Sequence, residues 1–302
     1  MHSISILCDP ALPIQDSANC QMPDGLPATL GLVGVGTIGS SLIRGLLAPG
    51  GSLSTPPRVV LSPRGAAKAA ELARDFPSHV VVAKTNQEVV DVADCVIIAV
   101  LFKQVEEADP SLLADVIMQK VVTLVAGLLP KRLQELSSPA SDCVSAIPLP
   151  AVARRAGSTL LTPPRPWAQA MFGICGKCVS VESEAEFRRL LCITTLMGDF
   201  YKRQLTAQRW LSSNGVAEAD AATWVGATFA TFAADSSAAE ADTFSKLVEE
   251  QTPGGLNEMV WKAQEADESY QSLAYSLDAA WPPEFRRNRR SNHISLKLEF
   301  DV

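Results

Sequence analysis

The chain has 302 residues, of which 47% are hydrophobic, and it carries a formal net charge of −7 with a pI of about 5.1. This length suffices for one large or two ordinary domains, and the acidic balance argues against nucleic acid as a partner, because nucleic-acid-binding proteins usually present a basic face. No apolar run approaches the roughly 20 residues that a membrane-spanning helix needs, so no membrane partner is expected.

Residues 1–27 show little periodicity and are expected to form a loose extension. They lack the basic stretch and the long apolar stretch of a secretory signal, and they contain no Arg, unlike most transit peptides. The seven Cys residues are an odd number scattered over a long sequence, which does not fit a disulfide framework. We therefore expect a protein of the reducing cytoplasm.

From residue 28 to residue 182, short apolar runs alternate with segments of helical periodicity. Near-continuous apolar strands separated by helices are typical of a parallel sheet that is buried on both faces. We therefore predict an α/β Rossmann-like domain over residues 28–182. The expected strands lie at 29–36, 58–62, 79–83, 94–100 and 120–127, the expected helices at 37–47, 65–76, 86–93 and 105–117, and further strand and helix pieces at 131–137, 143–152 and 177–183.

From Ser183 onward the sequence shows helical periodicity alone, which predicts an all-α second domain over residues 183–282. Its first helical pattern, 183–213, opens with Ser183 as a candidate cap and with two Glu in the first turn. Residues 283–302 form a tail with Arg at positions 286, 287, 289 and 290. A solvated tail is the favoured interpretation, and a docking arm or an anion contact is the alternative.

A GxGxxG motif made of Gly34, Gly36 and Gly39 stands between the first expected strand and the first expected helix. In a dinucleotide site the first Gly permits a tight turn, the second lets the backbone approach a pyrophosphate, and the third lets helix and strand pack closely. The helix N-terminus then offers free N–H groups to the negative charge. We predict dinucleotide binding; a glycine-rich turn that has lost its ligand is the alternative.

The end of the next strand indicates which nucleotide binds. NAD sites usually place Asp or Glu here, on the ribose hydroxyls, whereas this chain has Ser62, Pro63 and Arg64. An Arg can hold a 2′-phosphate through charge-assisted hydrogen bonds. We therefore favour NADPH over NADH, with a surface Arg capping a loop as the alternative for Arg64.

Cys175 and Cys178 form a CxxC pair, which raises the question of redox activity. A catalytic CxxC opens a helix after a strand, but this one leads into an expected strand. A zinc site needs a second Cys or His pair, and the three His residues offer none nearby. We favour a structural role and expect no metal.

In five stretches the sequence resembles the pyrroline-5-carboxylate reductase family. The stretch "LGLVGVGTIGSSLIRGLL" is similar to the family's opening, and "LSPRGAAKAAELA" to its phosphate-binding turn and helix. "TNQEVVDVADCVIIAV" and "VTLVAG" are similar to its following strands, and "TPGGLNEM" to its Ser-Pro-Gly-Gly-x-Thr loop. The resemblance implies that the cofactor contacts are Gly34, Gly36, Thr37, Ile38, Gly39, Ser62, Arg64, Asn86, Ala99, Val100, Ala126 and Gly127.

For the substrate, the resemblance implies that the 252–255 loop supports a carboxylate through backbone N–H groups and a hydroxyl. Gly254 and Gly255 would give close approach, Thr252 would donate a hydroxyl, and Asn257 stands where the family has Thr. The alternative is a turn that simply breaks the helix. Thr195 and Tyr201 match the flanks of the family's catalytic helix start and are the candidate catalytic groups. The alternative is that Phe200 and Tyr201 belong to the ordinary core of a long helix.

The chain departs from the family at three places. Leu101 and Phe102 replace Lys-Pro after the fourth strand, Leu149 stands in a segment where the family has Asn, and "ITTLMGDFYKRQ" replaces Ser-Gly-Ser-Gly-Pro-Ala-Tyr. These departures bear on the substrate more than on the cofactor.

Three functions follow from these features. The first is NADPH-dependent reduction of the C=N bond of 1-pyrroline-5-carboxylate to proline, by a homodimer formed through the helical domain, as the resemblance implies. A protonated imine is already electrophilic and requires mainly positioning and exclusion of water. The second is reduction of another cyclic imine or a keto acid. The third is a non-enzymatic, NADP-binding regulatory protein.

Overall fold

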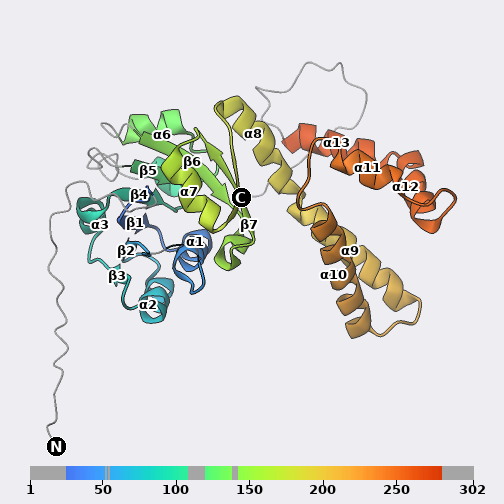
Figure 1. The fold of residues 1–302 in the computed structure, drawn as a ribbon, viewed down its shortest axis with the longest axis horizontal. Helices are drawn as coiled ribbons and strands as arrows, with labels where there is room; N and C mark the ends of the chain where they lie inside the picture. Colours follow the sequence, from blue (N-terminus) through green and yellow to red (C-terminus); the bar gives the residue numbers. More distant parts are fainter. Residues whose placement is uncertain (1–24, 52, 54, 108–119, 138–141, 281–302) are drawn as a thin grey trace, which may run out of the picture. The chain divides into compact units, whose positions relative to one another are not determined.

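The structure is a computed structural model that describes residues 25–51, 53, 55–107, 120–137 and 142–280 (Figure 1). Most of the predicted N-terminal extension, part of the helix expected at 105–117 and the whole Arg-rich tail lie outside these residues. The chain divides into two compact units, Met1–Arg188 and Arg189–Val302. The division lies six residues after the boundary predicted from the sequence, inside one helix.

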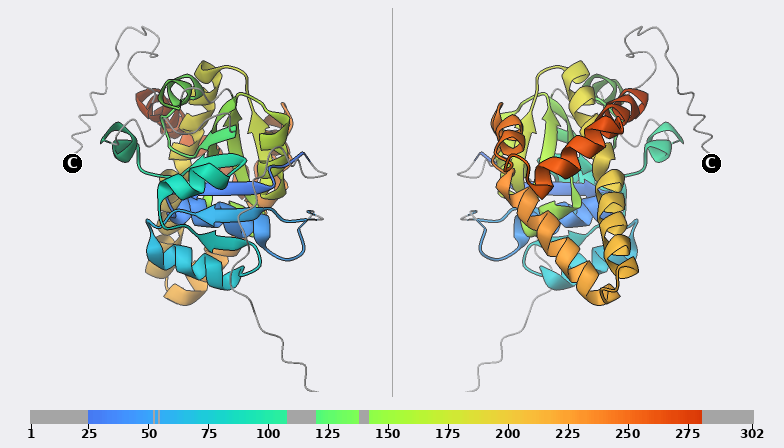
Figure 2. Two further views of the ribbon diagram at one scale, coloured as in Figure 1. Left: turned by 90° about the vertical axis from the view of Figure 1, so that its left-hand side faces the viewer. Right: turned by 90° about the vertical axis from the view of Figure 1, so that its right-hand side faces the viewer.

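The first unit contains a single eight-stranded sheet with the order β3-β2-β1-β4-β5-β6-β7-β8. In Figure 2 the blue β1 lies within the sheet, with β2 and β3 on one side and the greener later strands on the other. Strands β1 to β6 are parallel, β7 runs antiparallel to β6, and β8 is parallel to β7. The strands are β1 (Thr29–Val33), β2 (Arg58–Leu61), β3 (Val80–Val82), β4 (Cys95–Ile98), β5 (Lys120–Thr123), β6 (Asp142–Pro148), β7 (Gly157–Thr162) and β8 (Gly176–Ser180).

Helices follow most strands, as expected for a doubly wound fold, and the predicted α/β class is confirmed. They are α1 (Thr37–Leu47), α2 (Ala66–Asp75), α3 (Asn86–Val92), α4 (Phe102–Glu107), α6 (Pro130–Leu136) and α7 (Pro166–Ile174), with the 3₁₀ turn η1 (Pro150–Arg154). Strand order reverses between β1 and β4, because β1 connects onward to β2 on one side while β4 leads to β5 on the other. In open α/β sheets, ligands bind beyond the carboxyl ends of the strands at such a point.

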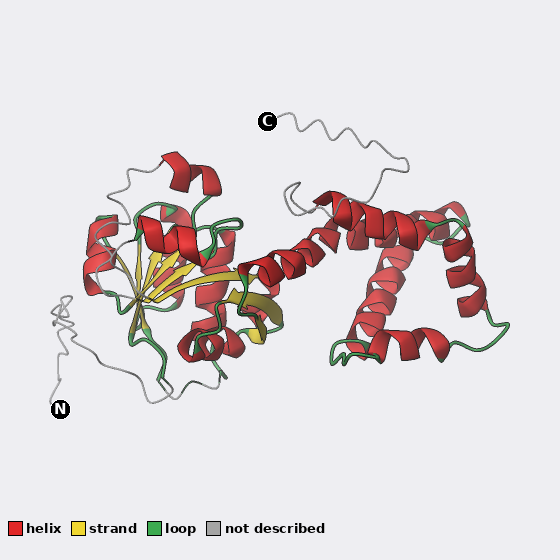
Figure 3. Cartoon of the chain, turned by 90° about the horizontal axis from the view of Figure 1, so that it is seen from above, coloured by secondary structure: helices red, strands yellow, loops and turns green. Residues whose placement is uncertain are grey.

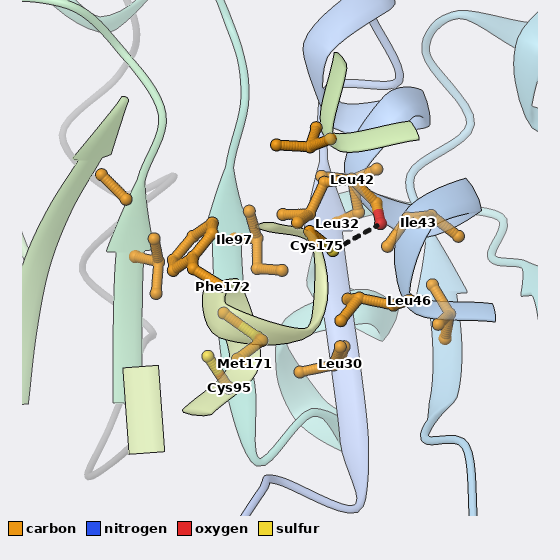
Figure 4. Packing of buried hydrophobic residues seen from close by; sticks show 14 of the residues in the cluster. Leu30, Leu32, Leu42, Ile43, Leu46, Cys95, Ile97, Met171, Phe172 and Cys175 are labelled. Carbon is orange, nitrogen blue, oxygen red and sulfur yellow. Dashed lines mark hydrogen bonds between the residues drawn. The ribbon is translucent and has the colours of Figure 1, made fainter. Parts of the chain in front are cut away.

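Both faces of the sheet are buried at its central strands, such as β1 and β4, and strand alternation divides the core between the two faces. Leu30, Leu32 and Ile97 point to the face where α1 and α7 pack, together with Phe172 (Figure 4). Val33, Val96 and Ile98 point to the opposite face, where Val89 and Leu133 of α3 and α6 cover them. This two-faced burial explains why the strands read as continuous apolar runs rather than as alternating ones.

Arg155 fixes the C-terminal end of α1. It follows η1 with a left-handed φ of 55°. Its guanidinium donates to three carbonyls at the end of α1: to Gly45 O at 2.8 Å, to Pro49 O at 3.2 Å and to Ala48 O. A cation at this end satisfies carbonyls that lack helical partners and complements the helix dipole.

The second unit is all-helical over its described residues, as predicted (Figure 3). The expected 183–213 helix is interrupted: α8 (Glu184–Cys192) and α9 (Met197–Ser213) are joined by the 3₁₀ turn η2 (Ile193–Leu196). Within that turn the Thr194 and Thr195 hydroxyls donate to carbonyls three residues earlier, which favours the tighter winding. The remaining helices are α10 (Glu218–Asp235), α11 (Thr243–Glu249), α12 (Leu256–Ala266) and α13 (Ser269–Ala280).

Packing within the second unit is sparse. Helices α9 and α10 pair as a hairpin, and α13 packs against both η2 and α12. Among its described residues the buried hydrophobic side chains are Ala221 and Val225 alone. Large apolar side chains are instead exposed on every helix from α9 to α13.

None of the described helices is both long and apolar enough to cross a bilayer.

Candidate dinucleotide site and helical-unit residues

The glycine turn lies at the carboxyl end of β1, where strand order reverses. Gly34 adopts a φ of 94°, and its N–H donates to Ser62 Oγ at 3.0 Å. A Cβ on Gly34 would lie 2.5 Å from Ala99 O, and one on Gly39 would lie 3.0 Å from Gly34 O. Gly34 and Gly39 are therefore required by the packing of the protein itself, in the roles predicted from the motif.

Gly36 differs from the other two glycines of the motif. It is exposed, caps α1 with extended backbone, and has no side-chain capping bond at that helix end. A Cβ on Gly36 would meet nothing closer than Ala99 O at 3.9 Å. Because no protein atom requires glycine here, the residue fits a position where a ligand approaches the backbone and the N-terminal N–H groups of α1.

The N-terminus of α2 adjoins the same turn. Gly65, which caps α2, has a φ of 84°, and a Cβ there would lie 2.6 Å from Val35 O. On the exposed side of this junction stand Arg64 and Lys68. Arg64 has no protein partner among the described residues, and Lys68 Nζ donates to Thr37 Oγ1 at 2.7 Å. Two helix N-termini and two cations thus meet beside an open glycine, which suits a ligand with several phosphates.

Lys68 was missed by the sequence analysis. It lies four residues after Arg64 and one turn into α2, so its ammonium can reach the same region. The i, i+4 spacing of two cations after the second strand was the available signal.

The buried Ser62 supports the turn rather than facing open space. Its hydroxyl accepts the Gly34 N–H, and its own N–H donates to Leu32 O at 2.9 Å. The structure therefore places Ser62 behind the glycine turn and leaves Arg64 on the exposed side.

Ala99 and Val100 are also brought to the turn. Ala99 N donates to Val33 O at 2.8 Å, and Val100 Cγ1 would lie 2.8 Å from a Cβ on Gly34. Ala126 and Gly127 form an exposed turn after β5, where Gly127 has a φ of 91° and faces the ring of Phe102. These residues lie at the carboxyl edge of the sheet; their contact with a cofactor stays a prediction.

Asn86 and Ile38 occupy the first turns of α3 and α1. Asn86 is half-buried and follows Thr85, whose hydroxyl accepts Glu88 N–H at 3.1 Å as a helix cap. Because β3 is parallel to β2, Asn86 lies on the same edge of the sheet as the glycine turn. Ile38 is half-buried beside the open Gly36 and Thr37.

Both cysteines of the CxxC pair are free thiols, and the pair joins the end of a helix to a strand instead of opening a helix. Cys175 ends α7 in full burial, and its thiol lies 4.0 Å from Leu42 O, as Figure 4 shows. Burial raises the pKa of the Cys175 thiol to about 12 and raises that of Cys178 as well. A protonated thiol is a poor nucleophile, so the structural role is supported. Among the described residues, no His, Cys, Asp and Glu side chains gather into a metal-binding group.

The turn at 252–255 belongs to the second unit. Gly255 N–H donates to Thr252 O at 2.9 Å, and Gly254 has a φ of 73°, as the third residue of a turn with Pro in second place requires. Gly254 N–H donates to Glu258 Oε2 at 2.7 Å, and Asn257 Nδ2 donates to Gln251 Oε1 at 2.9 Å. The segment is therefore a tight turn that starts α12, as the structural alternative predicts. A role in substrate binding stays a prediction.

Thr195 and Tyr201, the candidate catalytic residues, lie in η2 and α9. The Thr195 hydroxyl donates to Cys192 O at 2.6 Å. The Tyr201 side chain is exposed, and its ring lies 5.7 Å from that of Phe200. Since α13 packs against both η2 and α12, these two residues and the 252–255 turn belong to neighbouring parts of one helical unit.

Comparisons with known proteins agree with this arrangement. Residues 29–127 match the family model described as NADP oxidoreductase, coenzyme F420-dependent. No curated protein matches the chain at a significant level.

Three solved structures illustrate the likeness. A pyrroline-5-carboxylate reductase from Coxiella burnetii is 19% identical, with 84% of this chain and 96% of that chain covered and a TM-score of 0.71. The Plasmodium falciparum pyrroline carboxylate reductase, solved with NADP bound, is 15% identical, with 84% and 95% covered and a TM-score of 0.66. A reductive aminase from Aspergillus terreus, in complex with NADPH and ethyl-5-oxohexanoate, is 16% identical, with 74% and 76% covered and a TM-score of 0.52. The predicted resemblance is confirmed in the architecture, and this divergent chain has the fold of the pyrroline-5-carboxylate reductases.

Proposed function

We propose that the protein is a reductase that uses NADPH to reduce the C=N bond of a cyclic imine. The observation that carries the proposal is the open Gly36 at the N-terminus of α1, with Arg64 and Lys68 beside it. The fold gives further support, because proteins named as pyrroline-5-carboxylate reductase and reductive aminase share it.

NADPH is favoured over NADH by the charges beside the turn. β2 is followed by Ser62, Pro63 and Arg64, with no acid to receive the ribose hydroxyls. Arg64 lacks a protein partner among the described residues, so its guanidinium is available to a 2′-phosphate, and Lys68 adds a second charge. The bound cofactor would supply the hydride; Gly34, Gly36 and Gly39 would position its pyrophosphate.

The helical unit would position the imine. In this proposal the 252–255 turn and Asn257 hold the substrate, and Thr195 or Tyr201 lies near the reacting nitrogen. The Thr195 hydroxyl already donates to Cys192 O, so it would have to release that bond to donate elsewhere. A protonated imine accepts hydride without a further proton donor, which makes positioning the principal task.

We also propose a homodimer formed through the helical unit. Trp210, Trp224, Phe232, Phe244 and Val260 of this unit are 61–67% exposed. Large apolar side chains exposed on several helices of one unit are typical of an interaction surface, and a second copy of the chain would cover them. Sedimentation or light scattering at micromolar concentration is expected to give a dimer, and a monomer would contradict the proposal.

The activity test is loss of NADPH absorbance with 1-pyrroline-5-carboxylate, the substrate named by the resemblance, and with 1-pyrroline, the same ring without its carboxylate. Turnover of either imine supports the proposed reaction. NADPH binding without turnover of imines or keto acids would instead support the regulatory alternative. A role in proline biosynthesis and a cytoplasmic location stay predictions.

A second candidate is reduction of an imine other than 1-pyrroline-5-carboxylate. It is favoured by the hydrogen bond from Gly254 N–H to the Glu258 carboxylate, because this bond occupies a donor that would otherwise be open to a substrate carboxylate.

A further inference from the structure

The donors of the 252–258 turn are largely engaged within the chain. Gly254 N–H is bound by the Glu258 carboxylate at 2.7 Å, and Gly255 N–H by Thr252 O at 2.9 Å. One amide N–H of Asn257 is bound by Gln251 at 2.9 Å. A substrate carboxylate placed here would have to displace the Glu258 carboxylate, which belongs to the same segment of the chain and is therefore always close to the Gly254 N–H.

Glu258 also neutralises Lys262, the nearby cation that could otherwise attract a substrate carboxylate. Lys262 Nζ donates to Glu258 Oε1 at 2.7 Å, so the local pair carries no net charge. The bonds from Lys262 and from Gly254 N–H hold the pKa of the Glu258 carboxyl below its usual range, and the group is therefore ionised at neutral pH. The ionised Glu258 carboxylate occupies the Gly254 N–H and disfavours an incoming anion at that position, because like charges repel.

We propose that Glu258 is a specificity-determining residue that excludes carboxylate-bearing imines, and that the substrate is a cyclic imine without an acidic group. This inference rests on the proposed reductase function and narrows its substrate class. The Thr252 hydroxyl and the second amide N–H of Asn257 are neutral donors, which suit a neutral ring or substituent.

The test compares 1-pyrroline with 1-pyrroline-5-carboxylate for the full-length protein, using NADPH. Glu258→Gln removes the negative charge, keeps an oxygen that accepts the Gly254 N–H and leaves Lys262 without its partner. Glu250→Gln is the matched control, because it removes a nearby charge whose side chain takes no part in the turn. NADPH affinity and melting temperature are measured in parallel to show that both variants are folded.

We expect the wild-type kcat/KM to favour 1-pyrroline, and Glu258→Gln to shift the ratio about tenfold toward the carboxylate, through KM, as one removed charge predicts. Glu250→Gln should leave the ratio within about twofold, since an exposed charge is screened. A wild-type preference for 1-pyrroline-5-carboxylate, or an unchanged ratio in Glu258→Gln, would overturn this inference and leave the reductase function standing. Failure to reduce either imine would overturn both.

Discussion

The glycine turn allows stability and cofactor binding to be separated by two substitutions. Gly36→Ala adds a Cβ whose nearest protein neighbour is Ala99 O at 3.9 Å, at backbone angles of −89° and −169° that any residue adopts. Gly34→Ala adds a Cβ 2.5 Å from the same oxygen, at a φ of 94°. The first change meets open space, whereas the second meets protein.

The magnitudes follow from these distances. Gly36→Ala reduces the entropy of the unfolded chain, worth about 0.4–1 kcal/mol in favour of folding, and loses a Gly cap, worth a similar amount against it. The free energy of unfolding should therefore stay within about 1 kcal/mol of wild type. Gly34→Ala should lose about 2 kcal/mol or more, because a strained φ and a backbone clash add together.

For Gly36→Ala the main expected effect is on cofactor affinity, not on stability. The Cβ of Gly36→Ala would occupy the space through which a pyrophosphate reaches the first N–H groups of α1, so we expect NADPH affinity to fall at least about tenfold, equivalent to 1.4 kcal/mol. Urea unfolding gives the stability of the free protein, and fluorescence titration gives the NADPH affinity. Unimpaired NADPH binding by a folded Gly36→Ala protein would refute the placement of the pyrophosphate at this turn.

Three further predictions concern individual side chains. Arg64→Ala should weaken NADPH binding by about ten- to a hundredfold and leave NADH nearly unchanged, because one charge-assisted bond to the 2′-phosphate is lost; equal losses in titrations with both nucleotides would exclude that role. Arg155→Met should lower the free energy of unfolding by about 3 kcal/mol, because it removes two part-buried hydrogen bonds of a charged donor, each worth about 1.5 kcal/mol. The exposed control Arg154→Met should change the free energy of unfolding by less than about 0.5 kcal/mol; urea unfolding measures both. Since burial raises the pKa of Cys175 to about 12, its thiolate is scarce at pH 8, so mass spectrometry should find Cys175 unlabelled by a thiol reagent in the native protein and labelled in urea; rapid native labelling would contradict its burial.

The parts of the fold that sequence predicts well are those set by local patterns. The glycine motif is one example, since a strand, three spaced glycines and a helix are adjacent in the chain. Lys68 and Arg155 illustrate the opposite case, because their partners lie 31 and up to 110 residues away. Such contacts depend on how helices pack after folding.

The start of the helical unit is likewise not set by a local pattern in the sequence. The division at Arg188 lies within α8, where the sequence has no break, and it was predicted six residues earlier. The Pro-Gly-Gly turn was recognised, but its bond to Glu258 was not. The known capping pattern pairs an acid at this position with the N–H of the capping residue, Gly255, whereas the structure pairs Glu258 with the N–H of Gly254, so the pattern alone would have given the wrong partner.

The shortage of buried side chains in the helical unit has a consequence for how the protein assembles. The sheet unit closes its two-faced core within one chain, so its formation is a unimolecular event. The helical unit buries Ala221 and Val225 among its described apolar residues and leaves Trp210, Trp224, Phe232 and Phe244 exposed. In the proposed homodimer these side chains would be covered only after two chains meet, so the last step of folding would be bimolecular and its rate would rise with protein concentration. At low concentration, chains would accumulate with a folded sheet unit and an incompletely packed helical unit.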